Sequence, residues 1–194
     1  MNTQNIPAIA DEARERLRVG DDTSGMWPLD ELTHYILEHY HKGTVDRVNE
    51  LWMLAERCQG QPGATEMHVV AQLLGESYED LSNHFRKEEM MLFPYIIELQ
   101  ETISQGLEPQ PFHCGSVQFP CRQMMMEHDG ELERYDRILG ICKTFAEPFA
   151  SSAECQQLVS GIEAFLQKLQ EHIYLENENL FPRAIKAEGL EEMA

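Results

Sequence analysis

Two stretches of the chain share one arrangement of residues that could bind a metal ion. The first contains His84 and Glu88, the second His172 and Glu176, and both close on Leu-Phe-Pro, so that the pattern H-x3-E-x3-L-F-P occurs twice without a gap. On a helix, residues four apart lie one above the other on the same face. Each copy therefore presents an imidazole beside a carboxylate, which is the geometry of a bidentate pair of metal ligands.

Two further histidines extend this repeat. His41 precedes His84 by 43 residues and His128 precedes His172 by 44, so each half of the chain supplies a lone histidine and then an H-x3-E pair. Folded together, two such hairpins would bring four imidazoles and two carboxylates to one level. Two iron or manganese ions bridged by carboxylates use such a ligand set, whereas one ion does not need it. The hypothesis is a dinuclear site with six ligands: His41, His84, Glu88, His128, His172 and Glu176.

A simpler structural explanation exists for each piece taken alone. A lone histidine on an apolar helix face is commonly a hydrogen-bonded core residue, and an isolated H-x3-E is commonly a surface ion pair. Burying a carboxylate beside an imidazole is costly without a compensating charge, and here it would happen twice at matched depth, which favours a metal. For the other four histidines we expect solvated or packing roles: His34, His39, His68 and His113.

Four amphipathic segments could position these residues. Apolar residues recur at helical spacing in segments 28–60, from about 65 through 95, from about 120 to before Pro148, and 156–186, and Gly106 to Pro120 forms the longest loop. No segment alternates like a strand, so the predicted class is all-α, an up-down-up-down four-helix bundle with a short N-terminal extension. The expected organisation is an extension over 1–27, comprising a short helix and a linker, and a bundle over 28–194.

The composition limits the classes of partner that the protein can bind. The 194 residues, of which 42% are hydrophobic, suffice for one compact domain. With 34 acidic and 15 basic residues the net charge is -19, which repels nucleic acids and anionic membrane surfaces. The five cysteines include no C-x2-C pair, and they are expected to be small buried apolar groups, with Met124–Met126 as pliable core filler. No signal peptide or membrane-spanning run is evident, so a cytoplasmic location is expected.

Four segments in this order and spacing carry a resemblance to a known family, the hemerythrin-like or HHE cation-binding domain. They are Leu37-Glu38-His39-Tyr40-His41, His84-x3-Glu88-x3-Leu92-Phe93-Pro94, Met126-Glu127-His128-Asp129 and His172-x3-Glu176-x3-Leu180-Phe181-Pro182-Arg183. Three shorter segments resemble, more narrowly, the bacterial repair-of-iron-centres di-iron proteins: Lys87-Glu88-Glu89, Gly115-Ser116-Val117 and Leu175-Glu176-Asn177.

The resemblance implies a non-haem di-iron centre, with two iron ions bridged by carboxylates and by an oxo or hydroxo group. The histidines at 41, 84, 128 and 172 would be terminal ligands, and Glu88 and Glu176 would bridge. It further implies a role in defence against nitrosative and oxidative stress and in repairing iron-sulfur clusters. The partners would be oxygen, nitric oxide or peroxide, together with iron-sulfur proteins.

Two departures from the repair family stand out. A small N-terminal domain with a cysteine pair usually precedes the bundle there, whereas residues 1–26 of this chain contain no cysteine. That family also usually has a further histidine at the end of the first helix, where this chain has Cys58 and Gln59. Either Cys58 or Gln59 ligates there, or His68 reaches in from the next helix, or one iron keeps an open position at which a small molecule could bind.

Three functions remain in competition. The first is a stress-response protein that reacts with nitric oxide or peroxide and supports iron-sulfur repair. The second is an oxygen-binding or oxygen-sensing module without catalysis, which would show a stable charge-transfer band in oxygen. The third is a metal-free bundle in which the histidines are core packing, and stoichiometric iron in the purified protein would exclude it.

Overall fold

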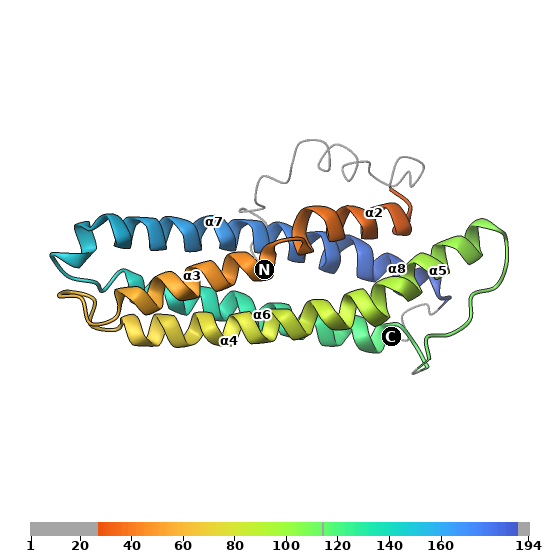
Figure 1. Ribbon diagram of the computed structural model, residues 1–194. Coiled ribbons are helices and arrows are strands. Elements are labelled where there is room, and N and C mark those ends of the chain that lie inside the picture. Colours follow the sequence, from red (N-terminus) through yellow and green to blue (C-terminus); the bar gives the residue numbers. More distant parts are fainter. Residues whose placement is uncertain (1–26, 114, 190–194) are drawn as a thin grey trace.

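The structure, a computed structural model, describes residues 27–113 and 115–189, and within these ranges the chain forms helices and no strand. Four antiparallel rods make up an elongated bundle (Figure 1). The helices of the bundle are α2 (Leu29–Ile36), α3 (Thr44–Cys58), α4 (Met67–Lys87), α5 (Phe93–Ser104), α6 (Gln118–Cys142), α7 (Ala153–Leu175) and α8 (Phe181–Ala187). The predicted all-α four-helix bundle is confirmed. The helix expected in the extension lies outside the described residues.

The first rod is interrupted beside His41. Helix α2 passes into a π-helical turn, η2 (Leu37–His41), and the chain then turns at Lys42 and Gly43 before α3 begins. Gly43 has a φ of 78°, in the left-handed region that glycine adopts without the strain of a side chain. The single helix expected from Pro28 to Gly60 is therefore wrong, because this glycine breaks it and leaves His41 at the end of a segment.

The H-x3-E-x3-L-F-P repeat becomes a structural repeat. Helix α4 continues through the π-helical turn η3 (Glu88–Leu92) into α5, and α7 continues through η5 (Glu176–Leu180) into α8. Pro94 and Pro182 each lie at the first turn of the helix that follows. A proline has no N–H and clashes with the carbonyl four residues before it, and a wider π-helical turn accommodates both effects. Each rod therefore stays continuous, with its glutamate at the start of the wide turn.

Local signals fix the remaining ends. Helix α6 begins at Gln118, so Pro120 lies in its first turn, where the missing N–H would have no partner in any case. A short 3-10 turn, η4 (Phe149–Ser151), precedes α7, and the Ser152 hydroxyl accepts a hydrogen bond of 3.1 Å from the Cys155 N–H as an N-cap. None of the helices in the described ranges combines the length and apolarity needed to cross a membrane.

Buried apolar side chains form two separate clusters along the bundle. One lies among α3, α4, α6 and α7 and includes Leu51, Leu74 and Ile162, while the other joins α2, α5 and α8 and includes Leu32, Ile96 and Phe181. The candidate ligands lie at the level of the π-helical turns, so the polar layer falls between the two apolar clusters.

The burial of the cysteines, of the remaining histidines and of the methionine run can be compared with what the sequence predicted. The four described cysteines are buried and free, as expected: Cys58, Cys121, Cys142 and Cys155. The side chains of His34, His39, His68 and His113 are exposed, as expected. Of the three consecutive methionines only Met124 is a buried core residue. Met126 is 68% exposed because it lies on the outer face of α6, so its expected core role is wrong.

Candidate metal centre

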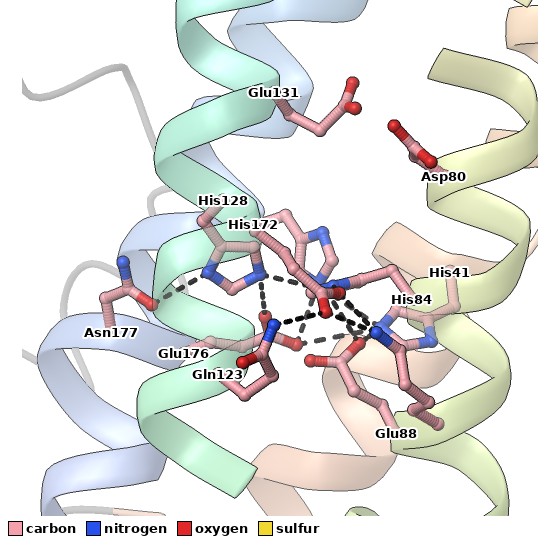
Figure 2. A network of polar contacts seen from close by, with 12 residues as sticks. His41, Asp80, His84, Glu88, Gln123, His128, Glu131, His172, Glu176 and Asn177 are labelled. Atoms are coloured by element: carbon pink, nitrogen blue, oxygen red, sulfur yellow. Dashed lines mark hydrogen bonds and ion pairs between the residues drawn. The ribbon is translucent and has the colours of Figure 1, made fainter. Parts of the chain in front are cut away.

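The structure brings all six predicted ligands together inside the bundle. Each comes from a helix end or a π-helical turn, except the histidine of α6, which lies within that helix. Figure 2 shows the four imidazoles and two carboxylates pointing toward one another from the different rods. All six are buried, with 6% or less of each exposed: His41, His84, Glu88, His128, His172 and Glu176.

The Nε2 atoms of the histidines face the interior of this site. His41 Nε2 lies 3.5 Å from Glu88 Oε2, and His84 Nε2 lies 3.3 Å from the same oxygen. On the other side, His172 Nε2 lies 2.8 Å from Glu176 Oε1, and His128 Nε2 lies 3.1 Å from Glu176 Oε2. Each carboxylate therefore meets the histidine of its own rod and at least one from another rod, and His41 Nε2 also lies 3.7 Å from Glu176 Oε1.

These contacts define two overlapping groups that could each hold a cation. The ligand atoms within each group lie within 4.8 Å of one another, and both groups use the same two carboxylates. One group adds His41 and His172, and the other adds His84 and His128. Two sites that share two carboxylates are the arrangement in which those carboxylates can bridge a pair of metal ions.

The hydrogen bonding of the buried carboxylates fits a cation. Both oxygens of Glu88 and Oε2 of Glu176 accept no hydrogen bond, although both side chains are 0% exposed. A buried carboxylate without such bonds is expensive unless a positive charge compensates it. Carboxylate and imidazole donors together suit iron or manganese, so the residues fit the metal pair expected of them.

The outer nitrogens of three imidazoles are held by acceptors. His41 Nδ1 lies 3.0 Å from Glu89 Oε1, and His84 Nδ1 lies 2.9 Å from Glu127 Oε2. His128 Nδ1 lies 2.8 Å from the side-chain oxygen of Asn177. An acceptor at Nδ1 requires the proton there, and a neutral ring then keeps its Nε2 lone pair for the site.

The Nε2 atoms of paired histidines are a second indication that the site accommodates a positive charge. His84 Nε2 and His128 Nε2 are 3.0 Å apart, and the Nε2 atoms of His41 and His172 are 3.2 Å apart. With Nδ1 protonated, two neutral rings in either pair would present two acceptors to each other. The pair of His84 and His128, in which both Nδ1 atoms are held by acceptors, therefore needs an added proton or a metal ion between its rings.

Without metal, the carboxylates favour protonated histidines at two positions. Burial lowers the pKa of His84, but the charge of Glu88 and the hydrogen bond with Glu127 outweigh it and raise that pKa to about 10. Burial likewise opposes protonation of His41, whose pKa is nevertheless raised by its contact with Glu176. Burial dominates for His172, whose pKa is lowered. The site thus holds positive charge even without metal, in the form of protons.

A cavity of about 270 Å³ between α4 and α6 leads to the site. Its inner wall includes His84, His128 and His172, and exposed Asp80 and Asn83 lie along the same cavity. Figure 2 shows Asp80 and Glu131 set apart from the ligand cluster, on the α4 and α6 sides of this opening. A small molecule can therefore reach the ligand histidines from the surface.

The side chains considered for a seventh ligand do not reach the site. Cys58 lies beside Glu154 and Cys155 at the start of α7, and 17 residues of continuous helix separate Cys155 from His172. At a rise of roughly 1.5 Å per residue, that distance is about 25 Å. His68 is 16 residues before His84 on α4, about 24 Å away on the same measure, and Gln59 follows Cys58. Ligation by Cys58, Gln59 or His68 is therefore wrong, because these residues lie at the end of α3 and the start of α4, at the end of the bundle far from the site.

Three polar contacts at the site were not predicted. Glu89, Glu127 and Asn177 hold the outer nitrogens, and each is adjacent in the chain to a candidate ligand. Their position next to a ligand in the sequence was the one available signal. Adjacent residues point in different directions on a helix, so each of them reaches a histidine of another rod rather than its own neighbour.

Comparison with known proteins agrees with this arrangement. The Hemerythrin HHE cation binding domain family matches residues 32–184. The chain is 30% identical over 193 residues to iron-sulfur cluster repair protein YtfE of Yersinia pestis (strain Pestoides F), covering 96% of this chain and 81% of that protein. Identity and coverage are the same for the protein of that name from Yersinia pseudotuberculosis serotype O:1b (strain IP 31758). With the family matched over most of its length, this chain belongs to the hemerythrin HHE cation-binding domain family.

Proposed function

We propose that this chain is a non-haem di-iron protein of nitrosative and oxidative stress defence that supports the repair of iron-sulfur clusters. The observation that carries the proposal is the similarity to two proteins named for iron-sulfur cluster repair, which extends over 96% of the chain and includes the whole site. The paired groups of ligands support two ions rather than one. The same similarity supports iron over manganese.

In this proposal each residue has a defined role. Four imidazoles would bind through Nε2, and Glu88 and Glu176 would hold the ions as the two carboxylates common to both ligand groups. Glu89, Glu127 and Asn177 orient three of the rings by holding Nδ1. Iron held there would supply one-electron and two-electron redox chemistry toward nitric oxide, peroxide or oxygen. The cavity of about 270 Å³ beside His84 and His128 has room for molecules of that size.

The proposal also assigns partners and organisation. Damaged iron-sulfur proteins would be the macromolecular partners, and the bundle over 28–194 would be the functional unit. The decisive experiment is to purify the chain anaerobically with iron, measure iron per chain, and add it to a [4Fe–4S] enzyme damaged by nitric oxide. Near two irons per chain and recovery of that enzyme's activity are expected, and no recovery with iron bound would refute the repair role.

A second candidate is an oxygen-binding or oxygen-sensing module. The observation that favours it is the complete burial of both carboxylates, which would protect a bound oxygen molecule from water. Reversible appearance of a stable charge-transfer band in oxygen, without cluster repair, would select this function. Rapid irreversible oxidation of the reduced protein would exclude it.

A further inference from the structure

The aromatic residues around the four histidines are of two kinds. Phe85 lies against His41 with ring centroids 4.3 Å apart, and Phe181 lies against His128 at 6.2 Å. The ring of Tyr40 stacks on His172, with centroids 5.8 Å apart and planes 18° apart. Phenylalanine resists oxidation, whereas tyrosine loses one electron readily when its proton has an acceptor. His172 is thus the candidate ligand in contact with an oxidisable ring.

Two more oxidisable rings continue outward from Tyr40. Tyr35 lies 6.0 Å from Tyr40 between ring centroids, and Trp27 lies 4.5 Å from Tyr35. Such separations are those of aromatic rings in direct contact. Tyr40 is 4% exposed, whereas Tyr35 is half-buried and also contacts the ring of exposed His39 at 4.4 Å. The three rings therefore form an unbroken row from a candidate ligand to half-buried Tyr35 and on to Trp27, which is 7% exposed, and the row approaches the surface at Tyr35 beside His39.

The contact between Tyr40 and His172 leaves almost no free volume beside it. The gap lined by Tyr40, Phe165 and His172 has a volume of about 10 Å³, at the lower limit of the roughly 10–15 Å³ that one water molecule needs. The cavity on the side of His84 and His128 is about 270 Å³. Substrate and electrons would therefore use different sides of the site, the open cavity for the one and the packed rings for the other.

Tyr40 also has groups that suit proton-coupled oxidation. Its hydroxyl donates a hydrogen bond of 3.5 Å to Glu171 Oε2, so an acceptor for the phenolic proton is in place. The Nζ atom of Lys168 lies 5.9 Å from the centroid of the Tyr40 ring. A positive charge over the ring disfavours a cation radical, so loss of the electron is favoured only together with loss of the proton.

We propose that Trp27, Tyr35 and Tyr40 form a relay that carries oxidising equivalents from the metal-loaded site to the protein surface. The relay rests on the proposed di-iron function, and it operates when peroxide reaches ions that are already oxidised and have no further electrons to give. Reduction of one peroxide to two waters consumes two electrons and two protons. The relay provides the two electrons one at a time, from a thiol or ascorbate in solution, and the two protons come from water.

At Tyr40 and Tyr35 each electron leaves together with a proton. Tyr40 gives one electron through the ring of His172 and its phenolic proton to Glu171, and becomes a neutral tyrosyl radical. Tyr35 then returns an electron to Tyr40, which recovers its proton from Glu171, while Tyr35 loses its own proton to solvent. Trp27 then gives an electron to Tyr35, which regains a proton from solvent, and the resulting Trp27 cation radical is reduced by the one-electron donor in solution.

The test detects the radical and not the activity. Protein carrying ring-deuterated tyrosine is loaded anaerobically with iron, its iron content is measured, and samples frozen after addition of hydrogen peroxide are examined by electron paramagnetic resonance. A tyrosyl radical whose signal narrows on deuteration is expected. Tyr40→Phe keeps the ring that stacks on His172, so iron content should persist while the radical signal is lost. Trp27→Phe should leave a tyrosyl radical that decays more slowly.

The chain offers a matched control in its other tryptophan. Trp52 contacts Tyr78 with ring centroids 5.8 Å apart, in the apolar cluster among α3, α4, α6 and α7 and away from the ligands. Trp52→Phe and Tyr78→Phe should change neither the yield nor the lifetime of the radical. An iron-loaded Tyr40→Phe protein with an unchanged radical would overturn the relay alone. A native chain that binds no iron would overturn the relay and the proposed function together.

Discussion

The side-chain oxygen of Asn177 lies 2.8 Å from Nδ1 of His128, across the interface between two rods. The oxygen can only accept, so this hydrogen bond places the ring proton on Nδ1 and leaves Nε2 of the neutral ring free for a metal. A residue next to Glu176 in the chain thereby sets the tautomer of a histidine on another helix. The histidine that would bind the metal and the residue that sets its tautomer thus come from different parts of the sequence.

Removing this hydrogen bond tests its role. Asn177→Ala should weaken metal binding by roughly 10- to 100-fold, the usual cost of losing an outer partner of a ligand histidine. Competition with a chelator of known affinity measures the change. Asn49→Ala, on the exposed face of α3, is the matched control and should bind metal as the native chain does. Equal affinity in the two variants would show that the tautomer is set by something else.

Replacing a carboxylate ligand should have a larger effect. Glu88→Gln and Glu176→Gln keep the volume of the side chain but remove a charge shared by both ligand groups, so iron content should collapse. The loss of affinity should exceed the roughly 10- to 100-fold expected for the outer partners. Iron per chain is measured after anaerobic loading. Glu178→Gln, at an exposed position nearby, is the control, and native iron content in both ligand variants would refute the assigned roles.

Metal binding should release protons. Since the pKa of His84 is raised to about 10 in the metal-free protein, that ring is protonated at neutral pH and must lose a proton to bind a cation. Affinity should therefore fall as the pH is lowered from about 9 to 6. Calorimetry in buffers of different ionisation enthalpy counts the protons. Affinity independent of pH over this range would contradict a protonated His84.

The same raised pKa has a consequence for the metal-free protein. A histidine whose folded pKa lies above its ordinary value of 6.5 stabilises the fold through its protonated form. This contribution is fully present below about pH 6.5 and is lost as the pH rises through about 10. Urea unfolding of metal-free native protein and of the His84→Gln variant at several pH values should therefore converge as the pH rises.

Cys58 tests the ligand set because it is a residue that should not bind metal. Because it is buried at the far end of the bundle, Cys58→Ala should leave iron content unchanged while lowering the free energy of unfolding by about 1 kcal/mol, a typical cost for a core substitution. Iron analysis and urea denaturation measure the two effects. His41→Ala serves as the comparison that should lose iron. Loss of iron from the Cys58 variant would restore it as a ligand.

Glu188 holds the long loop against the last helix. Its carboxylate accepts hydrogen bonds from the Phe112 N–H at 2.8 Å, the Tyr95 hydroxyl at 2.6 Å and the Ser116 hydroxyl at 2.9 Å. Glu188→Gln removes the charge from these bonds and should destabilise the protein by roughly 1.5–3 kcal/mol. Faster proteolysis between 105 and 117 is the expected readout. Cleavage at the native rate would show that the loop is held by its apolar residues.

Local sequence rules were sufficient for the ligand pairs. The four-residue spacing of His84 and Glu88 places both on one face of one helix whatever the rest of the chain does. The repeat at His172 and Glu176 then required a common environment for both pairs. The amphipathic pattern likewise predicted the rods and the buried face of α7, where Phe165 and Leu169 lie in the core.

Contacts between rods could not be predicted from local sequence patterns. The break at Gly43 was missed because an isolated glycine is tolerated in many helices, and its turn depends on where α2 and α3 must lie. Family spacing placed Cys58 near the metal, but the length of α3 carries it about 25 Å away. The spacing of residues along a helix does not predict their position along the bundle axis unless the offset between the rods is known.

The sequence by itself determined the class of fold and the six side chains able to bind metal, because helical periodicity and i, i+4 pairing act within single segments. Tertiary structure alone decided which histidines share a carboxylate and which acceptor holds each ring. It also decided that Tyr40, and not a phenylalanine, stacks on His172. The physical reason is that these contacts join residues far apart in the chain, so they depend on how the rods are offset and rotated against one another.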